Sequence, residues 1–135
     1  MPDAFPITIY HNPDCGTSRN TLAMIEAAGY RPEVVAYRTT GWTRPLLETL
    51  LADMEMTPGQ ILREKGTRAA EMGLTAPSVS AEAFIEAMLE DPLLVNRPIV
   101  VTPKGTRLCR PSEVVLELLD QTPARFVKED GEVVG

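Results

Sequence analysis

The chain has 135 residues, of which 44% are hydrophobic and 24% are charged, and its formal net charge is −6. This length and composition indicate one globular domain with a sizeable core. The negative charge argues against nonspecific binding to nucleic acid or to an anionic membrane, and no apolar run approaches the roughly 20 residues that a membrane-spanning helix needs.

The N-terminus and the cysteine content favour a protein of a reducing compartment. Residues Met1–Pro6 lack the basic and apolar regions of a secretory signal peptide, so we expect none. The two cysteines, Cys15 and Cys109, lie far apart and do not make a disulfide framework. We therefore expect reduced thiols and a cytoplasmic location. Separately, we expect a monomer.

Strand and helix patterns alternate near the N-terminus. Ile7–Tyr10 and Pro32–Tyr37 are typical of short strands. Between them, Thr17–Ala28 has the apolar spacing of a helix, and Gly29 ends it. Two short strands joined by a crossover helix form a βαβ unit, so we expect these strands to be parallel.

The middle of the chain is predicted to be helical. The expected helices cover Arg44–Asp53, a short stretch from Thr57 to Arg63, and Ala81–Glu90. Thr43 and Ser80 can cap the first and the last of them, and Thr57-Pro58-Gly59-Gln60 has the spacing of a capping box. Residues from about 40 to 92 thus form a helical insertion between β segments. About 50 residues would bury too little surface alone, so we assign residues 1–135 to a single domain.

A β pattern returns after the insertion. Ile99–Thr102 is predicted to be a strand, and Thr102-Pro103-Lys104-Gly105 suits a type I turn from which Thr106–Cys109 pairs back as a hairpin. Pro111 opens a last helix over Ser112–Leu119. The polar tail Ala124–Gly135 is expected to be loosely held.

Cys15 lies between the first strand and the first helix. A thiol at a helix N-terminus faces unpaired backbone N–H groups and the positive end of the helix dipole, and both favour the reactive thiolate. The alternative is a small buried hydrophobic residue, a common role of free cysteine. Ser18 makes the motif Cys-x-x-Ser, so the local second thiol of a dithiol mechanism is absent from the sequence.

His11, the one histidine, precedes Cys15 by four residues. It can be a base or a cation that helps to hold the thiolate, or a residue that simply ends a strand. The two residues do not suffice as a metal site, because zinc would need further ligands and only Cys109 remains among cysteines and histidines. We therefore expect no metal.

Basic residues gather in a second segment. Asn96–Ser112 contains Arg97, Lys104, Arg107 and Arg110 and no acid. Basic residues at hairpin edges often discourage edge pairing, which suits Lys104 and Arg107. Arg97 and Arg110 each precede a proline at an element boundary and suit an oxyanion site better. Nucleic acid is a weaker candidate ligand, because the segment is short and lacks interleaved aromatic residues.

Three blocks of the sequence resemble the glutaredoxin-coupled arsenate reductases. The blocks are His11–Leu22, Asn96–Thr102 and Gly105–Glu113, the likeness runs from about Ile7 to about Asp130, and Lys128–Glu132 is similar to that family's tail. Three ordered blocks are far more specific than one short motif. The resemblance implies an α/β fold, namely a thioredoxin-like mixed four-stranded sheet with flanking helices and the helical insertion.

The resemblance also implies a role for individual residues. Cys15 falls on the catalytic cysteine, His11 on the histidine that helps to lower its pKa, Arg63, Arg97 and Arg110 on the arginines that hold the oxyanion, and Pro98 on a cis-proline, with Gly16, Thr17 and Ser18 in supporting positions. The implied reaction converts arsenate to arsenite through a covalent Cys15–arsenic intermediate that glutathione and glutaredoxin resolve. Glutathione would be a co-substrate, and no cofactor would be tightly bound.

Two other functions remain open at this point. One is that of the Spx-like regulators, a related group that shares this fold and binds a partner protein without turnover. Members of that group with a Cys-x-x-Cys motif have a second cysteine where this chain has Ser18. A general thiol transferase acting on glutathionylated proteins would use an activated cysteine but would not need an anion site of three arginines.

Overall fold

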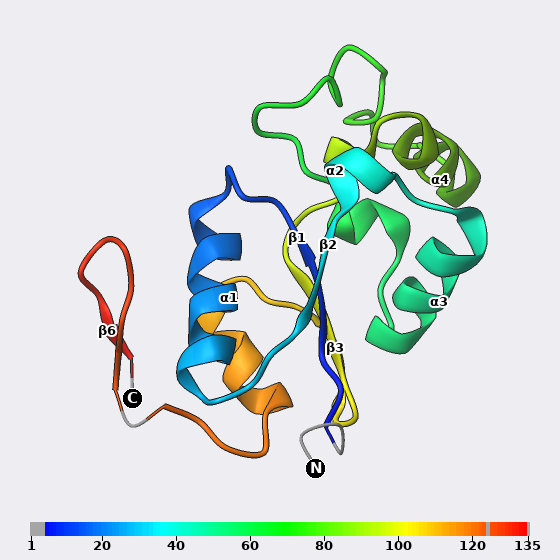
Figure 1. Ribbon diagram of the computed structural model, residues 1–135. Coiled ribbons are helices and arrows are strands. Elements are labelled where there is room, and N and C mark those ends of the chain that lie inside the picture. Colours follow the sequence, from blue (N-terminus) through cyan, green and yellow to red (C-terminus); the bar gives the residue numbers. More distant parts are fainter. Residues whose placement is uncertain (1–4, 124, 135) are drawn as a thin grey trace. The chain divides into compact units, whose positions relative to one another are not determined.

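The computed structural model describes residues 5–123 and 125–134. Outside this part lie Met1–Ala4, Ala124 and Gly135. The expectations above for the first residues of the chain and for these two positions of the tail therefore fall outside the described residues. The chain forms two compact units (Figure 1). The first runs up to Ala36 and resumes at Arg97, and the second covers Tyr37–Asn96.

The first unit is built on a mixed sheet. In chain order its elements are β1 (Thr8–His11), α1 (Gly16–Ala27), β2 (Glu33–Ala36), β3 (Ile99–Thr102), β4 (Gly105–Leu108), the 3₁₀ helix η4 (Ser112–Leu118), β5 (Phe126–Val127) and β6 (Val133–Val134). Among the described residues, the sheet has four strands in the order β2-β1-β3-β4. β1 is parallel to β2, and the other pairs are antiparallel. The structure thus confirms the mixed four-stranded sheet and the parallel βαβ unit.

One face of this sheet is covered by α1 and η4, which pack against each other on the same side (Figure 1). Their apolar side chains meet those of the strands in a core that includes Ile9, Met24, Val100 and Val115, all fully buried. Burial of aliphatic side chains on this scale is the main force that holds the unit together. Because α1 is fixed on the sheet, the loop before it is fixed as well.

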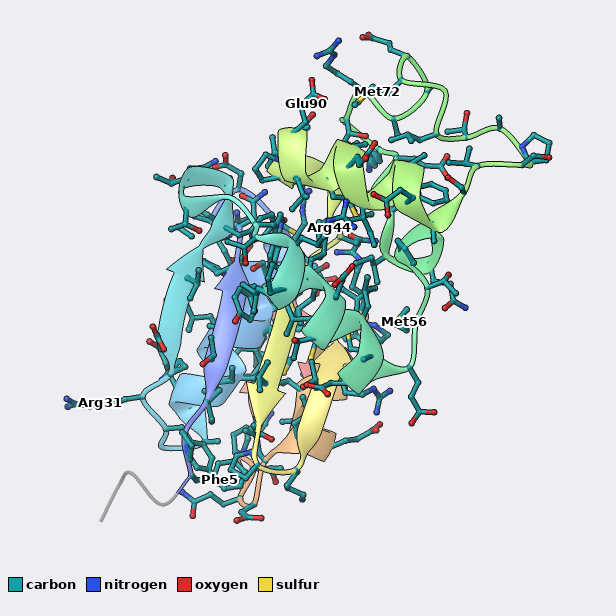
Figure 2. All side chains as sticks on the ribbon, turned by 90° about the vertical axis from the view of Figure 1, so that its right-hand side faces the viewer. Phe5, Arg31, Arg44, Met56, Met72 and Glu90 are labelled. Atoms are coloured by element: carbon teal, nitrogen blue, oxygen red, sulfur yellow. The ribbon has the colours of Figure 1, made fainter. Side chains whose placement is uncertain are left out.

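The second unit is the helical insertion. Its elements are α2 (Tyr37–Thr40), α3 (Arg44–Met54), the 3₁₀ helix η2 (Pro58–Ile61), α4 (Ala81–Glu90) and the 3₁₀ helix η3 (Pro92–Leu94). The expected caps are present: Thr43 accepts the N–H of Leu46, and Ser80 accepts the N–H of Ala83. Figure 2 shows Arg44 between α3 and α4, where its guanidinium makes two hydrogen bonds to Glu82.

The expected last helix is present as the 3₁₀ helix η4, which ends at Leu118, one residue before the expected end. One expectation needs correction. The tail is not loosely held in its described part, because Phe126–Val127 and Val133–Val134 pair as an antiparallel hairpin whose turn is hydrogen-bonded to α1. The prediction failed because those contacts join residues more than 100 positions apart. Within the described residues, no helix is both long enough and apolar enough to traverse a bilayer.

Candidate active site

Strand register brings the two expected arginines together. β3 and β4 pair with Ile99 opposite Leu108. The residues two positions before Ile99 and two positions after Leu108 therefore leave the hairpin at the same end, and these are Arg97 and Arg110. The N–H of Cys109 donates to the carbonyl of Pro98 at 2.9 Å and holds this end closed.

The same end of the sheet also carries Cys15. β1 pairs antiparallel with β3, with Tyr10 opposite Ile99, so the carboxyl end of β1 lies where β3 begins. Cys15 follows four residues after His11, the last residue of β1, and occupies the N-cap position of α1. Its N–H donates to the carbonyl of Asn12, and its carbonyl accepts the N–H of Arg19. The predicted strand–turn–cysteine–helix arrangement is confirmed.

The Cys15 sulfur is surrounded by hydrogen-bond donors. The side chain is buried, with 8% of the residue exposed, and burial acts to raise its pKa. Hydrogen bonds from the Ser18 N–H, from Arg97 and from Arg110 outweigh burial and hold the pKa below the ordinary value of a cysteine. A larger fraction of Cys15 is therefore thiolate at neutral pH than for an ordinary cysteine.

Arg97 and Arg110 form one assembly around this sulfur. Nη1 of Arg110 lies 3.8 Å from Sγ of Cys15 and also donates to the carbonyl of Arg97 at 2.8 Å. The bond to the Arg97 carbonyl holds the guanidinium of Arg110 in place next to the sulfur. The Arg97–Pro98 peptide bond is cis, as the resemblance implies, and so is the bond between Arg110 and Pro111.

His11 is hydrogen-bonded to Ser18, whose N–H faces the Cys15 sulfur. Its Nδ1 lies 2.6 Å from the Ser18 hydroxyl oxygen, which also accepts the N–H of Asn12 at 3.1 Å. Burial first, and then the positive charge of Arg19, lower the pKa of His11, so its neutral form prevails at pH 7. Of the two functional roles considered for His11, the neutral imidazole suits a base better than a cation, because desolvation disfavours the charged form. Its part in lowering the pKa of Cys15 stays a prediction.

Asn12 is a residue whose structural role the sequence analysis missed. It is 2% exposed, and its side-chain oxygen accepts the N–H of Asp14 at 2.9 Å. The backbone carbonyl of Asn12 also accepts the N–H of Cys15. These two bonds form a compact turn that places Cys15 at the start of α1. An asparagine before Pro13-Asp14 is a recognisable signal for such an Asx turn.

The other expected site residues are placed as follows. Gly16 and Thr17 open α1, and a Cβ at Gly16 would only touch Arg19 and Glu129, at 3.7 and 3.9 Å. Arg63 belongs to the second unit, where its Nε donates to the carbonyl of Lys65. Its part in binding the oxyanion stays a prediction.

The basic segment has two kinds of member. Lys104 donates to the carbonyl of Leu119, and Arg107 pairs with Glu117 at 2.8 Å on the surface. Arg97 and Arg110 instead direct their charge at a sulfur. Lys104 and Arg107 therefore suit the role of basic residues at a hairpin edge, whereas Arg97 and Arg110 suit an oxyanion site.

Cys109 is an unsuitable partner for Cys15. Both thiols are free, and Cys109 is fully buried in the core of the first unit. Burial raises the pKa of Cys109 to about 12, so it stays protonated at neutral pH. In the described part of the chain, no group of three or more His, Cys, Asp or Glu side chains is placed to hold a metal ion.

Comparisons with known proteins agree with this geometry. The sequence profile of the ArsC family matches residues 10–118. An arsenate reductase of Rhizobium meliloti is 58% identical over 129 residues, which are 95% of this chain and 92% of that protein. Arsenate reductase ArsI2 of Synechocystis sp. is 57% identical over the same length, again with 95% and 92% covered.

Solved structures show the same fold. An arsenate reductase from Vibrio cholerae superposes with a TM-score of 0.80 at 37% identity, covering 85% of this chain and 98% of that one. This agreement confirms the thioredoxin-like α/β fold. The family profile spans Cys15, Arg97 and Arg110, the residues that the structure brings together, and the chain belongs to the ArsC family.

Proposed function

We propose that this protein reduces arsenate to arsenite, with Cys15 as the nucleophile. The observation that carries the proposal is the Cys15 sulfur itself, which receives hydrogen bonds from the Ser18 N–H, Arg97 and Arg110. These donors stabilise a thiolate and also suit a tetrahedral oxyanion docked against it. The relatives above, which carry the name arsenate reductase, support this choice of oxyanion.

The first step forms a sulfur–arsenic bond. Arsenate docks on Arg97 and Arg110, with Arg63 as a third binding residue that the family resemblance supplies. The Cys15 thiolate attacks arsenic, and one arsenate oxygen leaves as hydroxide or water. Arsenic remains As(V) in this adduct, because thiolate has replaced an oxygen ligand and no electrons have been transferred. The arginines offset the charge that gathers on the remaining oxygens.

The reducing electrons come from outside the chain. Ser18 stands where a dithiol protein has its second cysteine, and Cys109 is buried and protonated. Glutathione therefore attacks the arsenic of the adduct, forms a second arsenic–sulfur bond and displaces another oxygen as water. The glutaredoxin thiolate then attacks the glutathione sulfur, and a glutathione–glutaredoxin disulfide forms as the bond between that sulfur and arsenic breaks. The electron pair of the broken bond stays on arsenic and reduces As(V) to As(III), and water then displaces the Cys15 sulfur and releases arsenite. This chemistry needs reduced glutathione and thus belongs to a reducing compartment such as the cytoplasm.

A coupled assay tests the proposal. Purified protein is mixed with glutathione, glutaredoxin, glutathione reductase and NADPH, and NADPH oxidation is followed after arsenate is added. We expect oxidation that requires all components and that stops when Cys15 is replaced by serine. Arsenite in the product, measured by chromatography with elemental detection, confirms the reaction.

The same assay separates the alternatives. A Spx-like regulator would oxidise no NADPH under any combination. A thiol transferase would reduce a glutathionylated protein, and arsenate would not compete with that substrate. Omitting glutaredoxin tests the external thiol directly, since undiminished turnover without it would refute the proposed electron path.

A further inference from the structure

The C-terminal hairpin contacts both segments that build the site. In Figure 1 it lies beside α1, on the side of that helix away from the sheet, with its turn next to the start of the helix. The turn is closed by hydrogen bonds from the Lys128 N–H to Glu132 and from the Gly131 N–H to Lys128, at 2.8 and 2.9 Å. Lys128 and Glu129 are consecutive residues at this turn, so their side chains can reach different partners.

Glu129 is linked through Arg19 to the loop between β1 and Cys15. Its two carboxylate oxygens accept Nε and Nη2 of Arg19, at 2.8 and 2.9 Å. The remaining nitrogen, Nη1, donates to the carbonyl of Pro13 at 2.7 Å, two residues before Cys15. The N–H of Glu129 also donates to the side chain of Asn20 on α1. A bidentate pair fixes the plane of a guanidinium. Here the pair with Glu129 holds Arg19 so that its third nitrogen, Nη1, stays bonded to the Pro13 carbonyl in the loop before Cys15.

Lys128 is linked through Glu113 to the segment that contains Arg110. Its ammonium lies 2.6 Å from Glu113 and 2.9 Å from Glu132, and the side chain is only 8% exposed. Glu113 stands in the first turn of η4, three residues after Arg110. One ammonium shared by two carboxylates thus ties the hairpin turn to the start of η4, and only the ammonium side of these pairs is shielded from solvent.

We propose that the hairpin turn is a clamp for the active site, in which Lys128 and Glu129 are positioning residues that hold the Arg110 segment and the Cys15 loop in one arrangement. Neither residue contacts the sulfur. Glu129 acts through Arg19 and Pro13, and Lys128 acts through Glu113. The proposal rests on Cys15 being the reactive thiol of the site but not on arsenate being its substrate.

Glu129→Gln gives a discriminating test, because charge and positioning predict opposite results. The readout is the ratio of the rates at which iodoacetate, an anion, and iodoacetamide, which is neutral, alkylate Cys15. Removing a carboxylate near Arg19 makes the surroundings more positive and, by charge alone, raises the ratio or leaves it unchanged. If the clamp is loosened, the sulfur moves away from Arg97 and Arg110, which attract the anionic reagent. We then expect the iodoacetate-to-iodoacetamide ratio to fall about three- to tenfold, which is less than the roughly 100-fold loss of rate that a 1 Å misplacement can cause.

The control is Glu82→Gln, which breaks a comparable pair. Arg44 holds Glu82 by two hydrogen bonds, at 3.1 and 2.6 Å, and Glu82 is solvent-exposed like Glu129. We expect this variant to keep the wild-type ratio. Glu129→Asp retains the charge but shortens the reach by one methylene, so a positioning role gives it an intermediate ratio.

Lys128→Met and Glu113→Gln break the other half of the clamp, and Glu113→Gln leaves Lys128 in place should the buried methionine disturb folding. Each folded variant is expected to lower the ratio as well. A ratio that stays at or above the wild-type value in Glu129→Gln, or that falls equally in Glu82→Gln, overturns the clamp. Because neither reagent contains arsenic, a protein that shows the expected ratios without arsenate turnover would refute the proposed function and leave the clamp standing.

Discussion

Replacing Arg110 with alanine removes two hydrogen bonds from the site at once. One goes to Sγ of Cys15 at 3.8 Å, and the other goes to the carbonyl of Arg97 at 2.8 Å. A hydrogen bond to a charged group contributes about 1.5–3 kcal/mol. If that contribution is lost from transition-state binding, kcat/KM for arsenate falls by about 10- to 150-fold. The substitution also leaves the carbonyl of Arg97 without this donor, so the effect combines a lost charge with a lost backbone contact.

The same substitution changes the acidity of the thiol. Burial raises the pKa of Cys15, and Arg110 is one of the donors that lower it, so Arg110→Ala raises that pKa. The thiolate fraction at pH 7 then falls, and the curve of alkylation rate against pH moves to higher pH. Steady-state turnover and iodoacetamide alkylation measure the two effects. Arg107→Ala is the matched control, because Arg107 pairs with Glu117 on the surface. Equal small effects of the two substitutions would show that Arg110 does not serve the sulfur.

Three further substitutions test other parts of the site. Cys15→Ser is expected to abolish turnover in a protein with an unchanged circular dichroism spectrum, since a hydroxyl is a far weaker nucleophile at neutral pH; a folded and active variant would refute the assignment. Cys109→Ala is expected to keep most turnover and to lower the free energy of unfolding modestly, and a Cys15–Cys109 disulfide found by mass spectrometry during catalysis would contradict this. Ser18→Ala removes the partner of His11 and of the Asn12 N–H, so denaturant unfolding should show a loss of about 1–3 kcal/mol, whereas Thr21→Val on the same helix should cost less.

Local chemistry made much of the fold predictable. Thr43 and Ser80 were expected to cap helices, and both side chains do so. Each such cap depends on residues within one helical turn, so the sequence contains the whole signal. The pairing of Arg97 with Arg110 was predictable in the same way, because the hairpin turn over Thr102–Gly105 sets the register that places both arginines at one end.

Long-range contacts were not predictable in this way. The pair of Arg19 with Glu129 spans 110 positions, and a polar tail gives no periodic signal of its own. The protonation state of His11 could not be decided from the sequence for a different reason. Its pKa depends first on burial, which is a property of the packed structure and not of the neighbouring residues. The contact of the tail and the protonation state of His11 are therefore both properties that only the tertiary structure determines.

The acidic residues near the site explain how a chain of net charge −6 keeps a positive field at one sulfur. Glu129 is paired with Arg19, Glu117 with Arg107, and both Glu113 and Glu132 with Lys128. A carboxylate paired with one cation presents a dipole and not a net charge, and the field of a dipole falls off faster with distance than that of an ion. The four acids share three cations, so only one negative charge, at Lys128, is not offset. The charges of Arg97 and Arg110 at Cys15 are consequently reduced less than four unpaired acids would reduce them. In this protein, the global charge is therefore a poor guide to the site, and the pairing of the surrounding carboxylates is the property that permits anion chemistry.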